Sequence, residues 1–345
     1  MTATTQTDSV AQARGILRIN TAYFQSKVLQ SAVELGLFEH LSAGPATVAE
    51  LRERLGLGHV LVKEFLDALT GLGLLEADGD TYRNSAGAAQ FLVPGRPQYL
   101  GGAVLQHSRL HYHSWSRLTE ALRDGRSKFH QSTNGPSAFG QHYEDPERAR
   151  NLMAHMDAFN GIVADELAVL VDWSNHSSFV DIGGARGNVA ARLALAQPHL
   201  KGGVFDLPAL RPLFDELMRD LDTADRVDFH AGDFFADPLP EADVLIIGHV
   251  LHDWPVTKRR ELVRRTYDAV RPGGALIIYD AMLDDEQRDP HALLQCLNCS
   301  MIREGGSEYA VSECRDYVEQ AGYTFEQAIP ANTVTNDRFV VARKS

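Results

Sequence analysis

The segment from Ser178 to Asn188 constrains the fold more than any other part of this chain. Its sequence is SFVDIGGARGN, in which an apolar stretch ends in Asp181 and passes through a glycine-rich turn into a helix-like segment. Such a turn is typical of parallel sheets that bind a nucleotide-like cofactor at the carboxyl ends of their strands. The same turn also occurs as a plain strand-to-helix connection without a ligand, and the segment alone does not separate the two.

The rest of the chain after Phe179 alternates between apolar and amphipathic segments. Helical patterns cover 188–196, 210–221 and 258–270, and a turn is expected at 271–274. The apolar segments are FVDIGG, GGVFDLP, VDFHAGDFF, DVLIIGHVLHDW and ALIIYDAML. Apolar strands separated by amphipathic helices predict an α/β fold, a Rossmann-like doubly wound sheet with helices on both faces. We expect this domain to span residues 151–345, entered through a helix from Pro146 to Leu170.

Residues 1–150 are predicted to form a separate helical domain. Apolar residues recur at helical spacing over 16–41, and a helix, a turn, a second helix and a small hairpin follow over 47–85, which is a winged-helix outline. A winged helix suggests DNA binding, but 45–89 holds 4 Lys/Arg and 7 Asp/Glu. Because phosphates require the opposite charge, a DNA-binding regulator is disfavoured.

Composition points to a small-molecule partner. The 345 residues carry a net charge of -13, which disfavours nucleic acid and anionic membranes. No apolar run approaches the length of a membrane span, and the N-terminus lacks the apolar centre of a signal peptide, so we expect a cytoplasmic protein. Three cysteines argue against a disulfide framework, and we interpret Cys296 and Cys299 as two core thiols one helical turn apart.

A second apolar segment, GGVFDLP, ends in Asp206, where a carboxylate would accept hydrogen bonds from both hydroxyls of a ribose. This spacing suggests an adenosine cofactor. The glycine run at 183–187 departs from the G-x-G-x-x-G pattern of NAD sites and fits the tighter turn used around S-adenosylmethionine.

Taken together, SFVDIGGARGN, GGVFDLP, HAGDFF, GHVLHDWP, RPGGALIIYDAML and EGGSEY resemble, in order and spacing, the plant-type (class II) small-molecule O-methyltransferases, which bacteria use to tailor secondary metabolites. The segment AVELGLFEHL is similar to that family's dimerisation domain, where the winged helix does not bind DNA. The resemblance implies a homodimeric methyltransferase that uses S-adenosyl-L-methionine. One departure is Gly248, where plant members carry a Lys near the adenine.

The resemblance also implies the roles of individual residues. Asp181 would face the cofactor ammonium, Asp206 would hold the ribose, and Leu207 would pack on the adenine. Asp233 and Phe234 would flank the adenine ring, although Asp233 is also a plausible turn cap. The glycines would let the backbone approach the methionine part of the cofactor. The cofactor set is Asp181, Gly183, Gly184, Gly187, Asp206, Leu207, Asp233 and Phe234.

His252 is the candidate general base. Methyl transfer from a sulfonium needs an acceptor made nucleophilic, and a phenol is mostly neutral near pH 7, so a positioned base accelerates attack. By the same resemblance, Asp280 and Glu308 would flank the imidazole and orient it. The alternative is a histidine that caps a helix or lies in the core. Asp253 fits a first-turn carboxylate favoured by the helix dipole.

A second chemistry uses the same segment. His249, His252 and Asp253 could hold a metal ion, because some relatives of this family C-methylate α-keto acids with a metal at this position. Arg303 could then grip the substrate carboxylate. We keep O-methylation of a phenol or enol as the first hypothesis and metal-assisted C-methylation as the alternative.

The acceptor pocket is predicted along the helix from Asn151 to Val163. Its candidate lining residues are Met153, Met156, Phe159 and Asn160. Met and Phe suit a flat apolar substrate, but they suit a helix core equally. The sequence therefore does not name the acceptor.

Overall fold

The computed structural model describes residues 2–128, 143, 145–286 and 289–345 of the chain. Two compact units are present, Met1–Ser108 and Arg109–Ser345. The expected division after residue 150 therefore lies later in the chain than the division found. The physical reason is that helix α8 (Tyr112–Trp115) packs on α15 (Pro290–Ile302), which ties this stretch to the second unit. We call the two parts the N-terminal unit and the C-terminal unit.

The N-terminal unit has the predicted winged-helix outline. Helices α4 (Val48–Leu55) and α5 (Val62–Gly71) are followed by the hairpin of β2 (Leu75–Asp78) and β3 (Thr81–Asn84). Thr47 begins α4 with a capping box, since its hydroxyl accepts from the Glu50 N–H and Glu50 accepts from the Thr47 N–H. The other elements of this unit are α1 (Thr2–Asn20), α2 (Ala22–Glu34), α3 (Leu37–His40), η1 (Leu41–Ala43), β1 (Ala46–Thr47), α6 (Ala86–Phe91), α7 (Gly101–Gln106) and the start of η2 (His107–His111).

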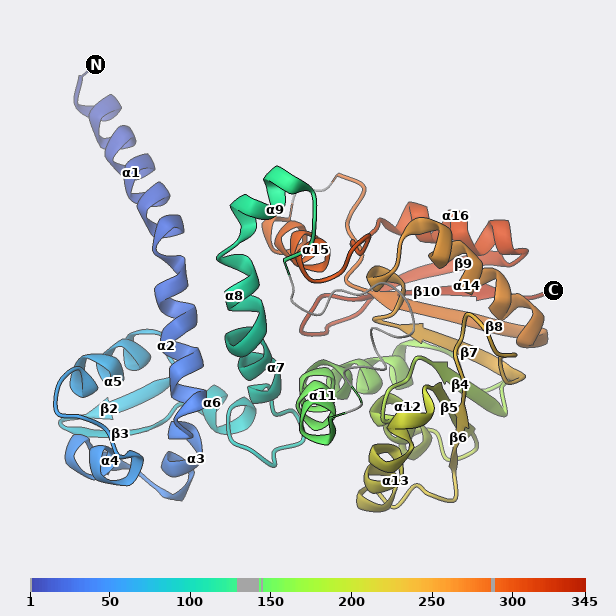
Figure 1. The fold of residues 1–345 in the computed structure, drawn as a ribbon, viewed down its shortest axis with the longest axis horizontal. Helices are drawn as coiled ribbons and strands as arrows, with labels where there is room; N and C mark the ends of the chain where they lie inside the picture. Colours follow the sequence, from blue (N-terminus) through green and yellow to red (C-terminus); the bar gives the residue numbers. More distant parts are fainter. Residues whose placement is uncertain (1, 129–142, 144, 287–288) are drawn as a thin grey trace. The chain divides into compact units, whose positions relative to one another are not determined.

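The described part of the C-terminal unit folds around a seven-stranded sheet of order β6-β5-β4-β7-β8-β10-β9 (Figure 1). Five strands are parallel and β10 pairs antiparallel with both of its neighbours. Chain order reverses between β4 and β7, which is the point where doubly wound sheets bind ligands. The strands are β4 (Ser178–Ile182), β5 (Lys201–Asp206), β6 (Val227–Ala231), β7 (Ala242–Gly248), β8 (Val270–Asp280), β9 (Thr324–Pro330) and β10 (Arg338–Arg343).

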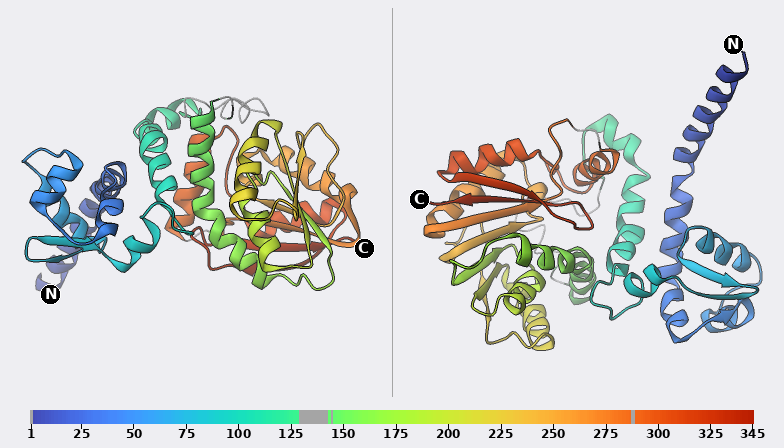
Figure 2. Two further views of the ribbon diagram at one scale, coloured as in Figure 1. Left: turned by 90° about the horizontal axis from the view of Figure 1, so that it is seen from below. Right: turned by 180° about the vertical axis from the view of Figure 1, so that it is seen from behind.

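Helices cover both faces of this sheet, as the two views of Figure 2 also show. Alternate strand residues point to opposite faces, so the strands other than β6 contribute to two separate apolar cores. One core packs against α11 (Pro146–Leu170), α12 (Asn188–Ala196) and α13 (Arg211–Asp220), and the other against α14 (Val256–Ala269) and α16 (Val311–Ala321). The remaining elements are α9 (Leu118–Asp124), η3 (Pro208–Leu210) and η4 (Leu251–Asp253).

The predicted Rossmann-like fold is thus confirmed, with two local differences. Residues 271–274, expected as a turn, belong to the long strand β8, in which Gly273 has φ of 76°. The antiparallel pair β9 and β10 had no counterpart in the sequence interpretation. Within the described ranges, no helix is both long and apolar enough to cross a membrane.

Candidate active site

The glycine turn joins β4 to α12 at the topological switch point of the sheet. Gly183 has φ of 76° and Gly187 has φ of 84°, a left-handed conformation that favours glycine. A Cβ on Gly183 would lie 2.8 Å from Val250 Cγ2, and one on Gly184 would lie 2.7 Å from the carboxylate of Asp181. The chain's own packing therefore requires these glycines, and their contact with a cofactor stays a prediction.

Asp181 and Asp206 lie at the carboxyl ends of the neighbouring strands β4 and β5. They are 3% and 9% exposed. Asp206 accepts hydrogen bonds from the Ala185 N–H at 2.8 Å and the Leu207 N–H at 2.7 Å. No donor among the described residues reaches the carboxylate of Asp181. Burial raises the pKa of Asp181 to about 7 and that of Asp206 to about 6.

Two buried carboxylates at adjacent strand ends complement a ligand that brings positive charge and hydroxyl donors. S-adenosylmethionine carries both, in its ammonium group and its ribose diol. The residues present therefore fit this cofactor, and the assignment of Asp181 to the ammonium and Asp206 to the ribose stays a prediction.

The expected adenine side contains Asp233 and Phe234. Phe234 lies beside the glycine turn, because a Cβ on Gly183 would be 3.5 Å from its ring. Asp233 accepts from the Phe235 N–H at 2.8 Å, so the turn-cap role is present whatever else this carboxylate does. At Gly248 a Cβ would lie 1.8 Å from the ring of Tyr279. Tyr279 therefore fills the space beside Gly248, and no side chain larger than hydrogen fits there.

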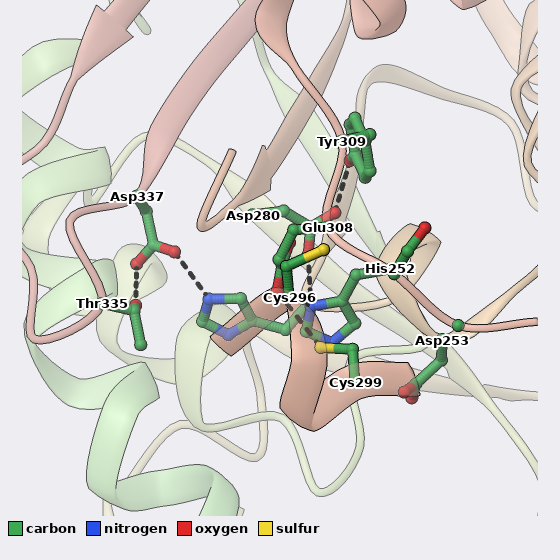
Figure 3. A network of polar contacts seen from close by, with 12 residues as sticks. His252, Asp253, Asp280, Cys296, Cys299, Glu308, Tyr309, Thr335 and Asp337 are labelled. Carbon is green, nitrogen blue, oxygen red and sulfur yellow. Dashed lines mark hydrogen bonds and ion pairs between the residues drawn. The ribbon is translucent and has the colours of Figure 1, made fainter. Parts of the chain in front are cut away.

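His252 lies beside the two predicted carboxylates, which approach its ring from the same side (Figure 3). It belongs to η4, just past the end of β7, while Asp280 ends β8 and Glu308 follows α15. Its Nδ1 is 2.9 Å from Glu308 Oε1 and 3.4 Å from Asp280 Oδ1. Tyr309 donates its hydroxyl to Asp280 Oδ2, and Cys299 Sγ lies 3.4 Å from Glu308 Oε1. The structure thus brings together all three residues predicted for catalysis.

Electrostatics favour an imidazole that holds its proton on Nδ1. Burial lowers the pKa of His252, but the charges of Glu308 and Asp280 outweigh it and raise this pKa well above its usual value. Burial also raises the pKa of Asp280 to about 7. The raised pKa favours the charged ring, with hydrogen on both nitrogens. In the neutral ring that forms above this pKa, the two carboxylates keep the hydrogen on Nδ1, so the lone pair is on Nε2. Among the residues that the structure describes, none forms a hydrogen bond with Nε2.

The alternative metal set is not assembled. His249 has a left-handed φ of 52°, and its Nε2 lies 2.9 Å from Asp337 Oδ1. Asp253 Oδ1 instead lies 3.4 Å from Arg303 Nε. The ligand atoms of His249, His252 and Asp253 do not converge, and Arg303 already faces a carboxylate of the protein. Metal-assisted C-methylation therefore gains no support from this geometry.

The residues predicted along the acceptor helix divide by burial. Met153 is fully buried in a small core with Ala185 and Leu210, which matches the core role considered from the sequence. Asn160 is also buried. Met156 and Phe159 are partly exposed, and the ring of Phe159 lies edge-on to His155 at 5.2 Å between centroids. Contact of these residues with an acceptor stays a prediction.

Sequence reasoning missed three residues that support the site. Tyr309, which follows Glu308 directly, could have been included as its neighbour. Asp337 is 88 positions from His249, and no sequence signal links them. Arg259 of α14 is 1% exposed and donates from Nε to the Trp254 carbonyl at 2.7 Å and from Nη2 to the Ser307 carbonyl at 2.6 Å. Arg259 thereby fastens the segment after His252 to the segment before Glu308.

With the fold and this geometry in hand, the class of protein follows. A doubly wound sheet with buried carboxylates at its switch point, beside a histidine held by two acids, defines a methyltransferase of the class I fold. Family models agree: the O-methyltransferase domain matches residues 115–324, and the O-methyltransferase dimerisation domain matches residues 17–94.

Sequence comparison with individual relatives identifies the family. The N,N-dimethyltransferase OxyT of Streptomyces rimosus is 54% identical over 99% of both chains. The tetracenomycin polyketide synthesis 8-O-methyl transferase TcmO of Streptomyces glaucescens is 47% identical over 90% of this chain and 91% of its own. The structure of human N-acetylserotonin methyltransferase in complex with SAM is similar with a TM-score of 0.86, at 26% identity over 97% of this chain and 98% of that one. The chain therefore belongs to the O-methyltransferase family, as an S-adenosylmethionine-dependent enzyme of the secondary-metabolite type.

Proposed function

We propose that this enzyme methylates a phenol or enol oxygen of a small secondary metabolite, with His252 as the general base. The observation that supports this most is the anchoring of His252 Nδ1 by Glu308 at 2.9 Å, with Asp280 at 3.4 Å. That contact fixes the ring and directs the Nε2 lone pair away from the two carboxylates. The cofactor supplies the methyl group, and the imidazole takes the acceptor proton as the oxygen becomes nucleophilic.

A second candidate acceptor atom is nitrogen. The relative named an N,N-dimethyltransferase is 54% identical along the whole chain, whereas the relative named an 8-O-methyl transferase is 47% identical. An amine with a pKa above neutral must also lose a proton before attack, so the same base serves both acceptors. Identity alone does not choose between them, and the base geometry is equally suited to each.

The deciding experiment measures label transfer from the cofactor to three panels of acceptors: phenols and enols, primary and secondary amines, and α-keto acids, each with and without chelator. Transfer to the first panel supports O-methylation, and transfer to the second supports N-methylation. Activity restricted to α-keto acids and abolished by chelator would refute both.

The base role has its own test. His252→Gln should lower turnover by on the order of 100-fold or more while cofactor affinity, measured by calorimetry, stays close to that of the parent. His291→Gln is the matched control, because His291 is exposed at the start of α15. Equal turnover in the two variants would show that His252 is not the base.

We also propose that the homodimer forms through the N-terminal helices. Ile16, Leu17 and Ile19 of α1 are 69%, 62% and 79% exposed, and Tyr23 and Phe24 of α2 are more than half exposed. Such a group of apolar side chains on two consecutive helices is typical of a surface covered by a partner. The match to the dimerisation domain over residues 17–94 supports a second copy of this chain as that partner.

A further inference from the structure

A group of three potential metal ligands surrounds the imidazole of His252. One ligand atom from each of His252, Cys299 and Glu308 lies within 4.8 Å of the other two. Asp280 lies beside this group, with Oδ1 3.4 Å from His252 Nδ1, but it is not one of the converging ligands. Figure 3 shows these side chains converging from separate segments of the C-terminal unit. A nitrogen, a sulfur and a carboxylate oxygen form a ligand set that Zn²⁺ accepts.

Their spacing is close to that of a tetrahedral zinc site. With bonds of about 2.0 Å to nitrogen or oxygen and about 2.3 Å to sulfur, neighbouring ligand atoms are separated by about 3.3–3.5 Å. The observed separations are 2.9 Å from His252 Nδ1 to Glu308 Oε1 and 3.4 Å from Cys299 Sγ to Glu308 Oε1, and the ligand atoms of all three residues lie within 4.8 Å of one another. Small side-chain movements would therefore be enough for three protein ligands to hold the ion with its fourth position open.

Burial and charge also point to a cation at this place. Asp280 is fully buried and Glu308 is 6% exposed, so two carboxylates share one imidazole away from bulk water. Within the described part of the chain, Asp280 Oδ1 and Glu308 Oε2 are buried without a hydrogen-bond donor. Tyr309 donates to the other oxygen of Asp280 and so holds this second carboxylate beside His252.

We propose that His252, Cys299 and Glu308 form an inhibitory site for Zn²⁺, with Asp280 beside it. Binding removes the proton from Cys299 and releases it to solvent. The metal also displaces the hydrogen of His252 Nδ1 to solvent, and because the Nδ1 lone pair is then used, the neutral imidazole takes a proton from solvent on Nε2. The lone pair that accepts the acceptor's proton is thereby lost, and turnover stops. The inhibition rests on the proposed base role of His252, whereas the binding of the metal does not.

Metal binding is tested without any activity measurement. The full-length protein, freed of metal by chelator, is titrated with Co²⁺ and followed by absorption spectroscopy. We expect one equivalent to give the visible bands of tetrahedral cobalt and a sulfur-to-cobalt charge-transfer band, both displaced by Zn²⁺. Cys299→Ser should remove the charge-transfer band and weaken Zn²⁺ binding by more than about 10-fold, since the loss of even an outer partner has that effect.

Cys296→Ser is the matched control, because Cys296 lies one turn earlier on α15 and is outside the group whose ligand atoms converge. It should keep the parent spectrum and affinity. Absence of a stoichiometric cobalt spectrum in the parent protein, or loss of the band in Cys296→Ser with retention in Cys299→Ser, would overturn the site. If Cys299→Ser does not fold, the cobalt spectra of the parent and of Cys296→Ser still show whether the metal site exists.

Activity then tests the consequence. Zn²⁺ should abolish methyl transfer by the parent enzyme at one equivalent, chelator should restore it, and Cys299→Ser should keep turning over at zinc concentrations that stop the parent. Metal binding without inhibition would refute the proposed base role of His252 and leave the site intact. Stimulation by the metal would overturn the inhibitory assignment.

Discussion

Replacing Arg259 with methionine should cost both stability and turnover. The guanidinium is 1% exposed and donates to the carbonyl oxygens of Trp254 and Ser307, at 2.7 and 2.6 Å. It also lies over the ring of Tyr309, with 4.9 Å from Cζ to the centroid. Methionine fills much of the same volume but donates no hydrogen bond. The two carbonyl oxygens would then be buried without donors.

The magnitude follows from these contacts. Each buried carbonyl oxygen without a donor costs about 1–3 kcal/mol, so the two together cost about 2–6 kcal/mol. Removing a buried charge offsets part of this, and we expect a net decrease of about 2–4 kcal/mol in the free energy of unfolding. Because the contacts hold the segments that carry His252 and Glu308, kcat should fall on the order of 10- to 100-fold while cofactor affinity changes little.

Equilibrium unfolding in urea and steady-state kinetics measure the two effects. Arg260→Met is the control, since Arg260 is exposed on the next position of α14 and should change the free energy of unfolding by less than about 0.5 kcal/mol. Arg259→Lys keeps the charge but loses the planar guanidinium that donates to both carbonyl oxygens. Its free energy of unfolding and its kcat should lie between those of the parent and Arg259→Met. Should Arg259→Met unfold at the parent midpoint with the parent kcat, the positioning role would be refuted.

Four further outcomes are expected. Asp206→Ala should weaken S-adenosylmethionine binding by about 1.5–3 kcal/mol in calorimetry, as for a lost charge-assisted hydrogen bond, and unchanged affinity would contradict the ribose role. Asp181→Asn should also weaken cofactor binding. Folding raises the pKa of Asp181 from 3.8 to about 7, so the free energy of unfolding of the parent falls as pH rises through that range. Asparagine removes this loss, and the cofactor-free variant should therefore be more stable than the parent at pH 8 by up to about 4 kcal/mol. Glu308→Gln removes the charge that raises the pKa of His252, so the rising limb of kcat/KM should move to lower pH; a profile that stays in place would contradict the contact's role. Ile16→Glu should convert the dimer into monomer in light scattering, and a persisting dimer would place the interface elsewhere.

Much of the fold was predictable because local periodicity specifies it. The helices over 146–170 and 188–196 begin and end where the sequence pattern predicted. Both have a clear start, α11 at Asp145 and Pro146 and α12 directly after the left-handed Gly187. The pair β9 and β10 was missed because the edge strand β9 is largely exposed and because β10 follows it without an intervening helix, which breaks the alternation of strand and helix.

The sequence by itself determined the apolar strands of the parallel sheet and the residues that end them. Parallel strands all present their carboxyl ends at one edge of the sheet. Because His252 follows β7 and Asp280 ends β8, the pairing of these two strands places the two residues close together. Tertiary structure alone decided the partners brought in from other segments. Asp337 meets His249, which is 88 positions away, and Arg259 joins the loop after His252 to the loop before Glu308. Contacts between segments far apart in the chain leave no periodic trace in the sequence, because they depend on how whole elements pack rather than on local propensity.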